Sequence, residues 1–162
     1  MRWPTTGFEV PRAPALPEGT VLDARCVEQQ RPPETNEDRG AVAAGWMLIG
    51  DYRGGWGIKT ILGASNFDGM CRPLGYQIFV FADELFVGAV APTTMDSRTD
   101  GAAVQTVLQG PDRLSVVFVR YADVDPLCCP SWTSAAAYQI DRSGARPALV
   151  LTSVFTSPTG GS

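Results

Sequence analysis

The sequence contains no histidine, and this absence removes several chemistries at once. Ser-His-Asp and Cys-His catalysis both use an imidazole as general base, and histidine is also a common metal ligand and proton shuttle. An excess of positive charge is missing as well, because the net charge is -4 with a pI near 4.7. Nucleic acid binding needs a basic surface, so this composition argues against a nucleic acid partner.

Long hydrophobic runs are also missing. The longest candidate, Ala41 to Ile49, is far shorter than the roughly 18 apolar residues of a membrane helix, and Gly45 interrupts it. We therefore expect no membrane-spanning segment. Met1 and Arg2 are followed by Trp3-Pro4 rather than by the apolar core of a signal peptide. Two interpretations remain at this point: a cytosolic protein, or a mature chain that has lost its targeting segment.

Length and composition predict one domain with an arm. The 162 residues are 44% hydrophobic and 19% charged, which is typical of a folded chain with its own core. We expect a Pro-rich arm over residues 1–40, with a short edge strand at 21–27 and an exposed polar loop at 31–40, because proline excludes long helix and central strand. A single mainly β domain is predicted over 41–156, followed by a flexible tail at 157–162.

Strand patterns dominate the domain. Residues 76–81 and 85–90 are rich in β-branched and aromatic side chains, and the Ala82-Asp83-Glu84 turn between them indicates a hairpin. The continuous apolar run from Leu114 to Tyr121 predicts a buried strand. Strands are also expected at 132–140 and 148–155, whereas 102–108 fits a strand or one helical turn and 41–49 fits a short helix. The predicted fold is α+β and mainly β: an antiparallel sheet of five or six strands, with room for one packed helix.

Two loops contain fragments of ligand-binding motifs, and both fail. The segment from Gly54 to Thr60 lacks the Gly-Lys step of a phosphate loop, because Ile58 precedes Lys59. The Asp96 to Gly101 segment begins like a calcium loop but has Arg98 at its third position. We predict neither a metal nor another cofactor, and we expect Arg98 to pair with a carboxylate that orders residues 95–101.

Carboxylates and aromatic residues leave two further alternatives open. Paired carboxylates can hydrolyse glycosides without histidine, and the loop residues Asp96, Asp100, Asp123 and Asp125 are the candidates. Exposed aromatic rings can stack on sugars, and Trp46, Tyr52 and Trp56 lie together in a glycine-rich segment. Solvated loop acids and buried core tryptophans are the ordinary alternatives, so we predict no catalytic residues.

The four cysteines carry more information than the loops. Cys26, Cys71, Cys128 and Cys129 lack the spacing of a zinc site or a redox Cys-x-x-Cys motif. A bond between the adjacent Cys128 and Cys129 would close a strained eight-membered ring. We therefore expect two disulfides in which Cys26 and Cys71 each pair with one member of the adjacent pair. If strands 76–81 and 114–121 are neighbours in the sheet, Cys71 lies near the adjacent pair, and Cys26 ties the arm to the same point. Two disulfides favour an oxidising compartment, and four reduced thiols in a cytosolic protein are the alternative.

Three segments resemble a known family. Phe79 to Gly88, Met95 to Gly101, and above all Arg120 to Ser131 with its Leu127-Cys128-Cys129-Pro130 sequence are similar to the LppP/LprE family of bacterial lipoproteins. The resemblance covers roughly residues 75–141. It implies a secreted, envelope-attached protein without an established enzymatic activity, and it supplies no catalytic residues. Because Asp23-Ala24-Arg25 does not fit a lipobox, Cys26 is not expected to be a lipid anchor.

These observations favour an extracytoplasmic, non-enzymatic envelope protein that binds a partner protein or an envelope component. The alternatives are a small carboxylate-dependent hydrolase that acts on cell-wall glycans, and a glycan-binding module. The candidate interaction residues are drawn from the polar loops and the aromatic segment: Asp96, Arg98, Asp100, Arg120, Asp125, Trp46 and Trp56.

Overall fold

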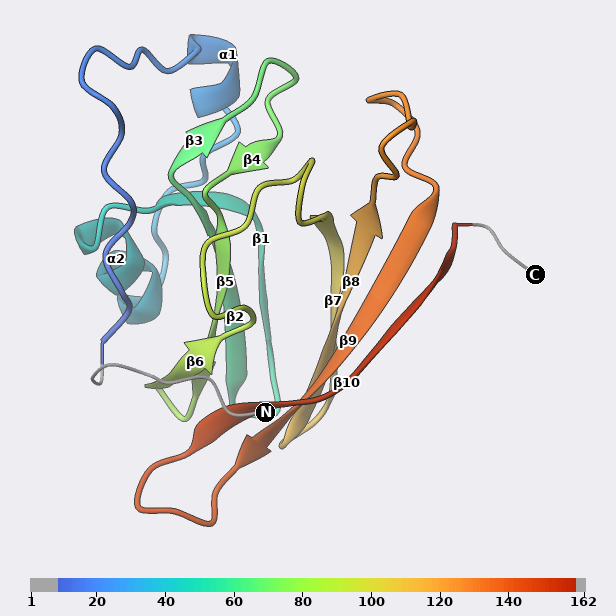
Figure 1. Ribbon diagram of the computed structural model, residues 1–162. Coiled ribbons are helices and arrows are strands. Elements are labelled where there is room, and N and C mark those ends of the chain that lie inside the picture. The colour runs from blue at the N-terminus through green and yellow to red at the C-terminus, as the bar shows by residue number, and fades with distance from the viewer. Residues whose placement is uncertain (1–8, 160–162) are drawn as a thin grey trace.

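Two four-stranded antiparallel sheets stack face to face in the computed structural model, which describes residues 9–159 except the side chains of residues 51–53 (Figure 1). The first sheet has the strand order β1-β2-β5-β6, and the second has the order β10-β9-β8-β7. A small third sheet pairs β3 with β4. In chain order the elements are α1 (Ala24–Val27), α2 (Asn36–Ala43), β1 (Met47–Gly55), β2 (Ile58–Ala64), β3 (Asn66–Phe67), β4 (Pro73–Leu74), β5 (Gln77–Ala82), β6 (Leu85–Ala89), β7 (Ala102–Gly110), β8 (Arg113–Arg120), β9 (Trp132–Asp141) and β10 (Ala148–Pro158).

The α+β, mainly β class predicted from the sequence is confirmed, but the number of strands is larger than predicted. The β5–β6 hairpin turns at Asp83 and Glu84, as expected, and both residues have positive φ. The prediction missed the β1–β2 hairpin because glycines obscure its pattern. Those glycines serve the turn itself: Trp56 and Gly57 have φ values of 59° and 77°, as a two-residue hairpin turn requires.

The main core lies between the two sheets. Alternate side chains of β8 point inward, namely Leu114, Val116 and Phe118, and they meet Ile78 and Val80 of β5. The run from Leu114 to Tyr121 was expected to be buried on both faces, but its other side chains are half-buried or exposed, because no element within residues 9–159 covers the outer face of the second sheet. The strand that is buried along its whole length is β5.

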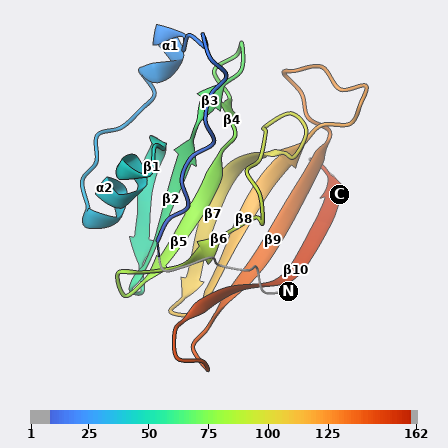
Figure 2. The same ribbon diagram turned by 60° about the vertical axis from the view of Figure 1, so that its left-hand side comes forward.

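A second core explains the burial of β5. Helix α2 and the N-terminal arm cover the outer face of the first sheet (Figure 2). There Trp46 packs edge-on against Phe79, with ring centroids 5.0 Å apart. Two hydrogen bonds fix residues 11–13 of the arm against this core. The backbone N–H of Ala13 donates to the carbonyl of Ala44 at 2.8 Å, and the indole Nε1 of Trp46 donates to the carbonyl of Pro11 at 2.7 Å. Pro4 lies outside the described residues.

The prediction of an exposed loop at 31–40 is wrong for its second half, because residues 36–40 belong to α2 and two of them are buried, whereas residues 32–34 are exposed. Thr35 and Asp38 form a capping box that starts the helix, and Asp38 is fully buried in a two-pronged ion pair with Arg31. Glu37 pairs with Lys59 of β2 at 3.1 Å. Polar residues indicated a solvated loop, but partners on the arm and the sheet neutralise them and allow burial.

Two further local predictions are corrected. Residues 41–49 do not form one helix: α2 ends at Ala43, Gly45 has a φ of 99°, and β1 begins at Met47. Residues 21–27 do not form an edge strand, because Asp23 caps the short helix α1 by accepting a hydrogen bond from the N–H of Arg25. The predicted boundaries at 40/41 and 156/157 fall within α2 and β10, although the division into arm, domain and tail itself stays a prediction.

Candidate functional site

Three loops meet at one end of the sandwich. They are residues 68–76 around β4, residues 95–101 before β7, and residues 121–131 between β8 and β9, and we call this region the loop end (Figure 1). Direct contacts join them: the N–H of Gly75 donates to the Asp96 carboxylate at 2.8 Å, and the Ser97 hydroxyl donates to the carbonyl of Pro73 at 2.6 Å. The loop end contains the predicted residues Asp96, Arg98, Asp100 and Asp125.

Tyr121 is the centre of the loop end. Its ring lies under two guanidinium groups, with the Cζ atoms of Arg72 and Arg98 at 5.2 and 4.5 Å from the ring centroid. Arg72 also donates to the Tyr121 hydroxyl at 2.8 Å, and that hydroxyl donates to the carbonyl of Leu127 at 2.9 Å. One side chain therefore links the β3–β4 loop, residues 95–101 and residues 121–131.

Arg98 does not form the predicted ion pair with a carboxylate in the described part of the chain. Its Nη2 atom donates to the backbone carbonyl of Asp125 at 2.9 Å, and its plane lies over the Tyr121 ring. The charged group is positioned by a carbonyl and an aromatic ring, and it joins two loops instead of ordering residues 95–101 alone. Sequence reasoning found Arg98 but missed Tyr121 and Arg72, since an isolated tyrosine and an isolated arginine carry no spacing signal.

The carboxylates of the loop end are used internally. One oxygen of Asp125 accepts hydrogen bonds from the N–H of Ala122 at 2.6 Å, and from the N–H and hydroxyl of Ser131 at 2.9 and 2.7 Å. Asp100 accepts from the N–H of Asp96 at 2.8 Å. The bonds from Ser131, followed by that from Ala122, lower the pKa of the Asp125 carboxyl. Asp125 is therefore a loop-closing acceptor that stays ionised.

Asp68 has the same role in the neighbouring loop. Burial opposes its ionisation, but the backbone N–H and the guanidinium of Arg72 outweigh burial, so the pKa of Asp68 is lowered. Its carboxylate lies 2.6 Å from Nε of Arg72. Arg72, which contacts Tyr121, is thus positioned by the ionised carboxylate of Asp68.

An apolar slot of about 180 Å³ opens beside the loop end. Its walls come from β8, β9 and β10 of the second sheet and from residues 90–95, and include Met95, Phe118 and Tyr138. Asp100 and Arg120 line the same slot, so the structure brings these two predicted residues together. The Tyr138 hydroxyl donates to the carbonyl of Val90 at 2.6 Å, which fixes one wall, and burial raises the pKa of that phenol.

A larger cleft of about 610 Å³ lies between the arm, α2 and the β5–β6 turn. Glu37 lines it, but this carboxylate is already paired with Lys59. None of the residues predicted to interact with a partner lies in this cleft. Among the described residues, no cluster of cysteine and acidic side chains is arranged to bind a metal ion.

The two predicted tryptophans differ in their exposure to solvent. Trp46 is only 2% exposed and belongs to the second core, whereas Trp56 is 65% exposed in the β1–β2 turn. The Tyr52 side chain lies outside the described residues. Trp46 therefore cannot share an exposed stacking surface with Trp56.

The predicted disulfide pairing is wrong. Cys26 is bonded to Cys71, and Cys128 is bonded to its neighbour Cys129. The prediction assumed that strands 76–81 and 114–121 are neighbours in one sheet, but β5 and β8 belong to different sheets. The adjacent pair that was rejected because of ring strain is accommodated in a turn, where the N–H of Cys129 donates to the carbonyl of Pro126 at 3.0 Å.

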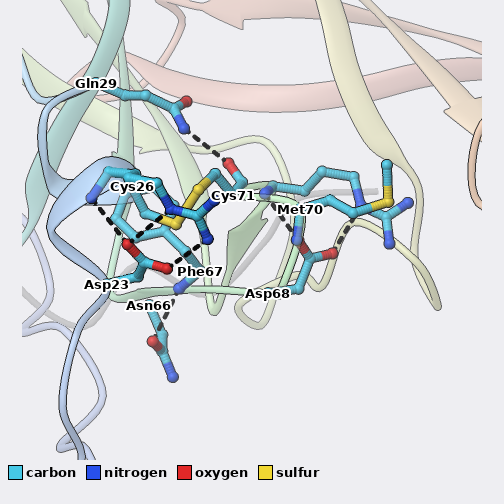
Figure 3. Close-up of a disulfide and its surroundings, with 10 residues drawn as sticks. Asp23, Cys26, Gln29, Asn66, Phe67, Asp68, Met70 and Cys71 are labelled. Atoms are coloured by element: carbon cyan, nitrogen blue, oxygen red, sulfur yellow. Dashed lines mark hydrogen bonds and ion pairs between the residues drawn. A yellow bond between two sulfur atoms is a disulfide. The ribbon is translucent and has the colours of Figure 1, made fainter.

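The Cys26–Cys71 disulfide fastens α1 to the β3–β4 loop (Figure 3). Cys26 is 1% exposed. The side-chain amide of Gln29 donates to the carbonyl of Cys71 at 3.1 Å, and Asp68 accepts from the N–H of Met70 on the other side of the loop. The disulfide therefore connects the arm to the loop end, as expected, although Cys71 rather than the adjacent pair is its partner.

The LppP/LprE lipoprotein family model matches residues 57–143, which is more than half of the chain. The chain belongs to this family. The matched segment runs from the β1–β2 turn to the end of β9 and includes the whole loop end, whereas Cys26, α2 and Trp46 precede it. No curated protein and no solved structure matches the chain. Membership in a lipoprotein family indicates an envelope-associated protein. Over residues 9–159, neither helix is long and apolar enough to cross a membrane.

Proposed function

We propose that this chain is an extracytoplasmic, non-enzymatic envelope protein, and that it binds a partner protein or an envelope component through the loop end. Two disulfides fit an oxidising compartment. The family relationship supports an envelope location. The binding role itself is supported by how the loop end uses its polar and apolar groups.

The observation that carries the proposal is the way in which the loop 121–131 places its polar and apolar side chains. One oxygen of Asp125 accepts three hydrogen bonds from its own loop, and the hydroxyl of Tyr121 donates to the carbonyl of Leu127. Apolar side chains instead face solvent: Val124 is 91% exposed, and Leu127 and Trp132 are also exposed. Asp123 is exposed as well, but the loop uses its best-bonded carboxylate, Asp125, for its own closure and presents apolar side chains to solvent, which favours docking over catalysis.

Site-specific photocrosslinking in the envelope of producing cells tests the binding role. A photoreactive residue at Val124 is compared with one at Val21, which is 90% exposed on the arm and gives a matched control. We expect a discrete adduct at position 124 that position 21 does not give. The mass of the adduct distinguishes a protein from a lipid or a glycan. Identical patterns at both positions, or no adduct at position 124, would contradict the proposal.

An activity assay tests the non-enzymatic part separately. A glycosidase of the two-carboxylate type needs one carboxyl with a raised pKa as general acid, whereas the pKa of Asp125 is lowered. We expect no turnover of peptidoglycan fragments or simple glycosides. Turnover that disappears in D100N or D125N would show that the chain is a hydrolase.

A further inference from the structure

The adjacent disulfide Cys128–Cys129 differs from the other disulfide in its accessibility. Both of its cysteines are exposed at the surface of the loop 121–131, whereas Cys26 is buried. Thiol–disulfide exchange begins when a thiolate attacks one sulfur of the bond, so it requires an open approach to that sulfur. A reductant can approach Cys128–Cys129 in the folded protein.

The loop has its own framework without this bond. Asp125 closes the loop by bonding Ala122 at one end and Ser131 at the other, and the Tyr121 hydroxyl holds the carbonyl of Leu127. Arg98 adds a bond to the carbonyl of Asp125 from outside the loop. A link between neighbouring residues joins no distant segments, so the loop can open the bond and remain in place.

We propose that Cys128–Cys129 is a site of thiol–disulfide exchange, and that its reaction partner is a protein dithiol. The thiolate of the donor attacks Sγ of one cysteine, which forms a mixed disulfide, breaks the Cys128–Cys129 bond and releases the other cysteine as a thiolate that takes up a proton. The second donor thiolate then attacks the donor's own sulfur in the mixed disulfide, which releases the remaining cysteine of the pair as a thiolate that also takes up a proton. Two electrons and two protons pass from the donor dithiol to this chain, and the donor leaves as a disulfide.

The surroundings of the pair suit a protein donor. Leu127 immediately precedes Cys128 and is exposed, and the exposed Trp132 follows the loop. Apolar side chains beside the reacting sulfurs offer a surface against which the surface around the active site of a dithiol protein can pack. This inference concerns the sulfur chemistry of the loop, and it stands even if the partner proposed above is not found.

Graded reduction of the folded, full chain tests the proposal. The protein is incubated with increasing dithiothreitol, free thiols are trapped by alkylation, and each cysteine is assigned by mass spectrometry while circular dichroism monitors the fold. We expect Cys128 and Cys129 to be alkylated at least tenfold faster than Cys26 and Cys71, with the β-sheet signal unchanged. Loss of both disulfides at one rate, together with unfolding, would overturn the proposal.

A trapping experiment tests the class of the donor. A thioredoxin-fold protein whose second active-site cysteine is replaced by serine stops at the mixed disulfide. We expect it to form a covalent adduct with the wild-type chain through Cys128 or Cys129, and none with the variant C128S/C129S. Absence of the adduct with the wild-type chain, or an equal adduct with the variant, would show that the pair is not an exchange site for a protein dithiol.

Discussion

The two disulfides of this protein bridge very different lengths of chain. Cys26–Cys71 spans 45 residues, is buried at Cys26, and joins the arm to a loop between two short strands. Cys128–Cys129 spans a single peptide bond and is exposed. In the chain-entropy description, closing a 45-residue loop contributes about 4 kcal/mol to the free energy of unfolding, whereas a link between neighbours restricts the unfolded chain very little. The first disulfide can be explained by stability, and the second cannot.

Removing each disulfide in turn should give the largest difference between the two regions. The variant C26A/C71A should lose up to about 4 kcal/mol of unfolding free energy, because the arm and the β3–β4 loop are then tied only by weaker contacts. The variant C128S/C129S should lose less than about 1 kcal/mol for the reason of loop length given above. Denaturant unfolding of both variants measures the difference, and equal losses would contradict this assignment.

The arm side can be weakened without touching its disulfide. Asp38 is fully buried and bonded by both terminal nitrogens of Arg31, at 2.7 and 2.8 Å. D38A should lower the free energy of unfolding by about 3 kcal/mol, because it removes the carboxylate from the buried ion pair with Arg31. The exposed neighbour Arg39, changed to alanine, is the control on the same helix. A loss below about 1 kcal/mol in D38A would show that Cys26–Cys71 alone holds this region.

The loop side should respond to its central ring. Tyr121 contacts two guanidinium groups and donates one hydrogen bond to the loop backbone. Y121L should cost about 1–2 kcal/mol, and Y121F should cost less because it keeps the ring under both arginines. Amide exchange of residues 122–131 should accelerate in Y121L while β8 stays protected. Unchanged exchange in Y121L would mean that the Cys128–Cys129 bond orders this loop.

Within the loop 121–131, acid should have the smallest effect and should act through Asp125, whereas the lowered pKa values of Glu37 and Asp38 make the arm side sensitive to acid as well. The pKa of Asp125 in the folded protein lies below its ordinary value of 3.8, so the ionised carboxylate stabilises the folded loop above that pH. This contribution is lost as the pH falls below about 3.8 toward the folded pKa. Exchange or fluorescence of Trp132 should report loosening of the loop in that range. D125N should show the loosened loop already at neutral pH, and a pH response that persists unchanged in D125N would exclude Asp125 as its source.

Much of the fold follows from local sequence patterns. The β5–β6 hairpin and strands β8 to β10 are predicted correctly because alternating or apolar segments are separated by turn residues. Helix α2 escaped prediction because its buried acids, Glu37 and Asp38, look like solvent-exposed residues until Lys59 and Arg31 are placed beside them. The charge that seemed to mark a loop instead fastens the helix to the sheet.

The candidate site shows a similar limit. Asp96, Arg98 and Asp125 were found because charged residues in loops are conspicuous, but their contacts depend on which strands share a sheet. The wrong disulfide pairing came from rejecting the adjacent bond because of ring strain and from expecting β5 and β8 to be neighbours in one sheet. The slot beside Arg120 is built from three strands of the second sheet and from residues 90–95, so no single segment of the sequence could reveal it.

Peptide mapping of the unreduced protein tests the central claim most directly. Trypsin releases residues 121–142 as one peptide that contains both Cys128 and Cys129. We expect this peptide to be linked to no other peptide and to be lighter by two hydrogen atoms than its dithiol form. The peptide that begins at Cys26 should be linked to the peptide that contains Cys71. A peptide 121–142 that is linked to either of those two would contradict the assignment of one structural and one exchangeable disulfide.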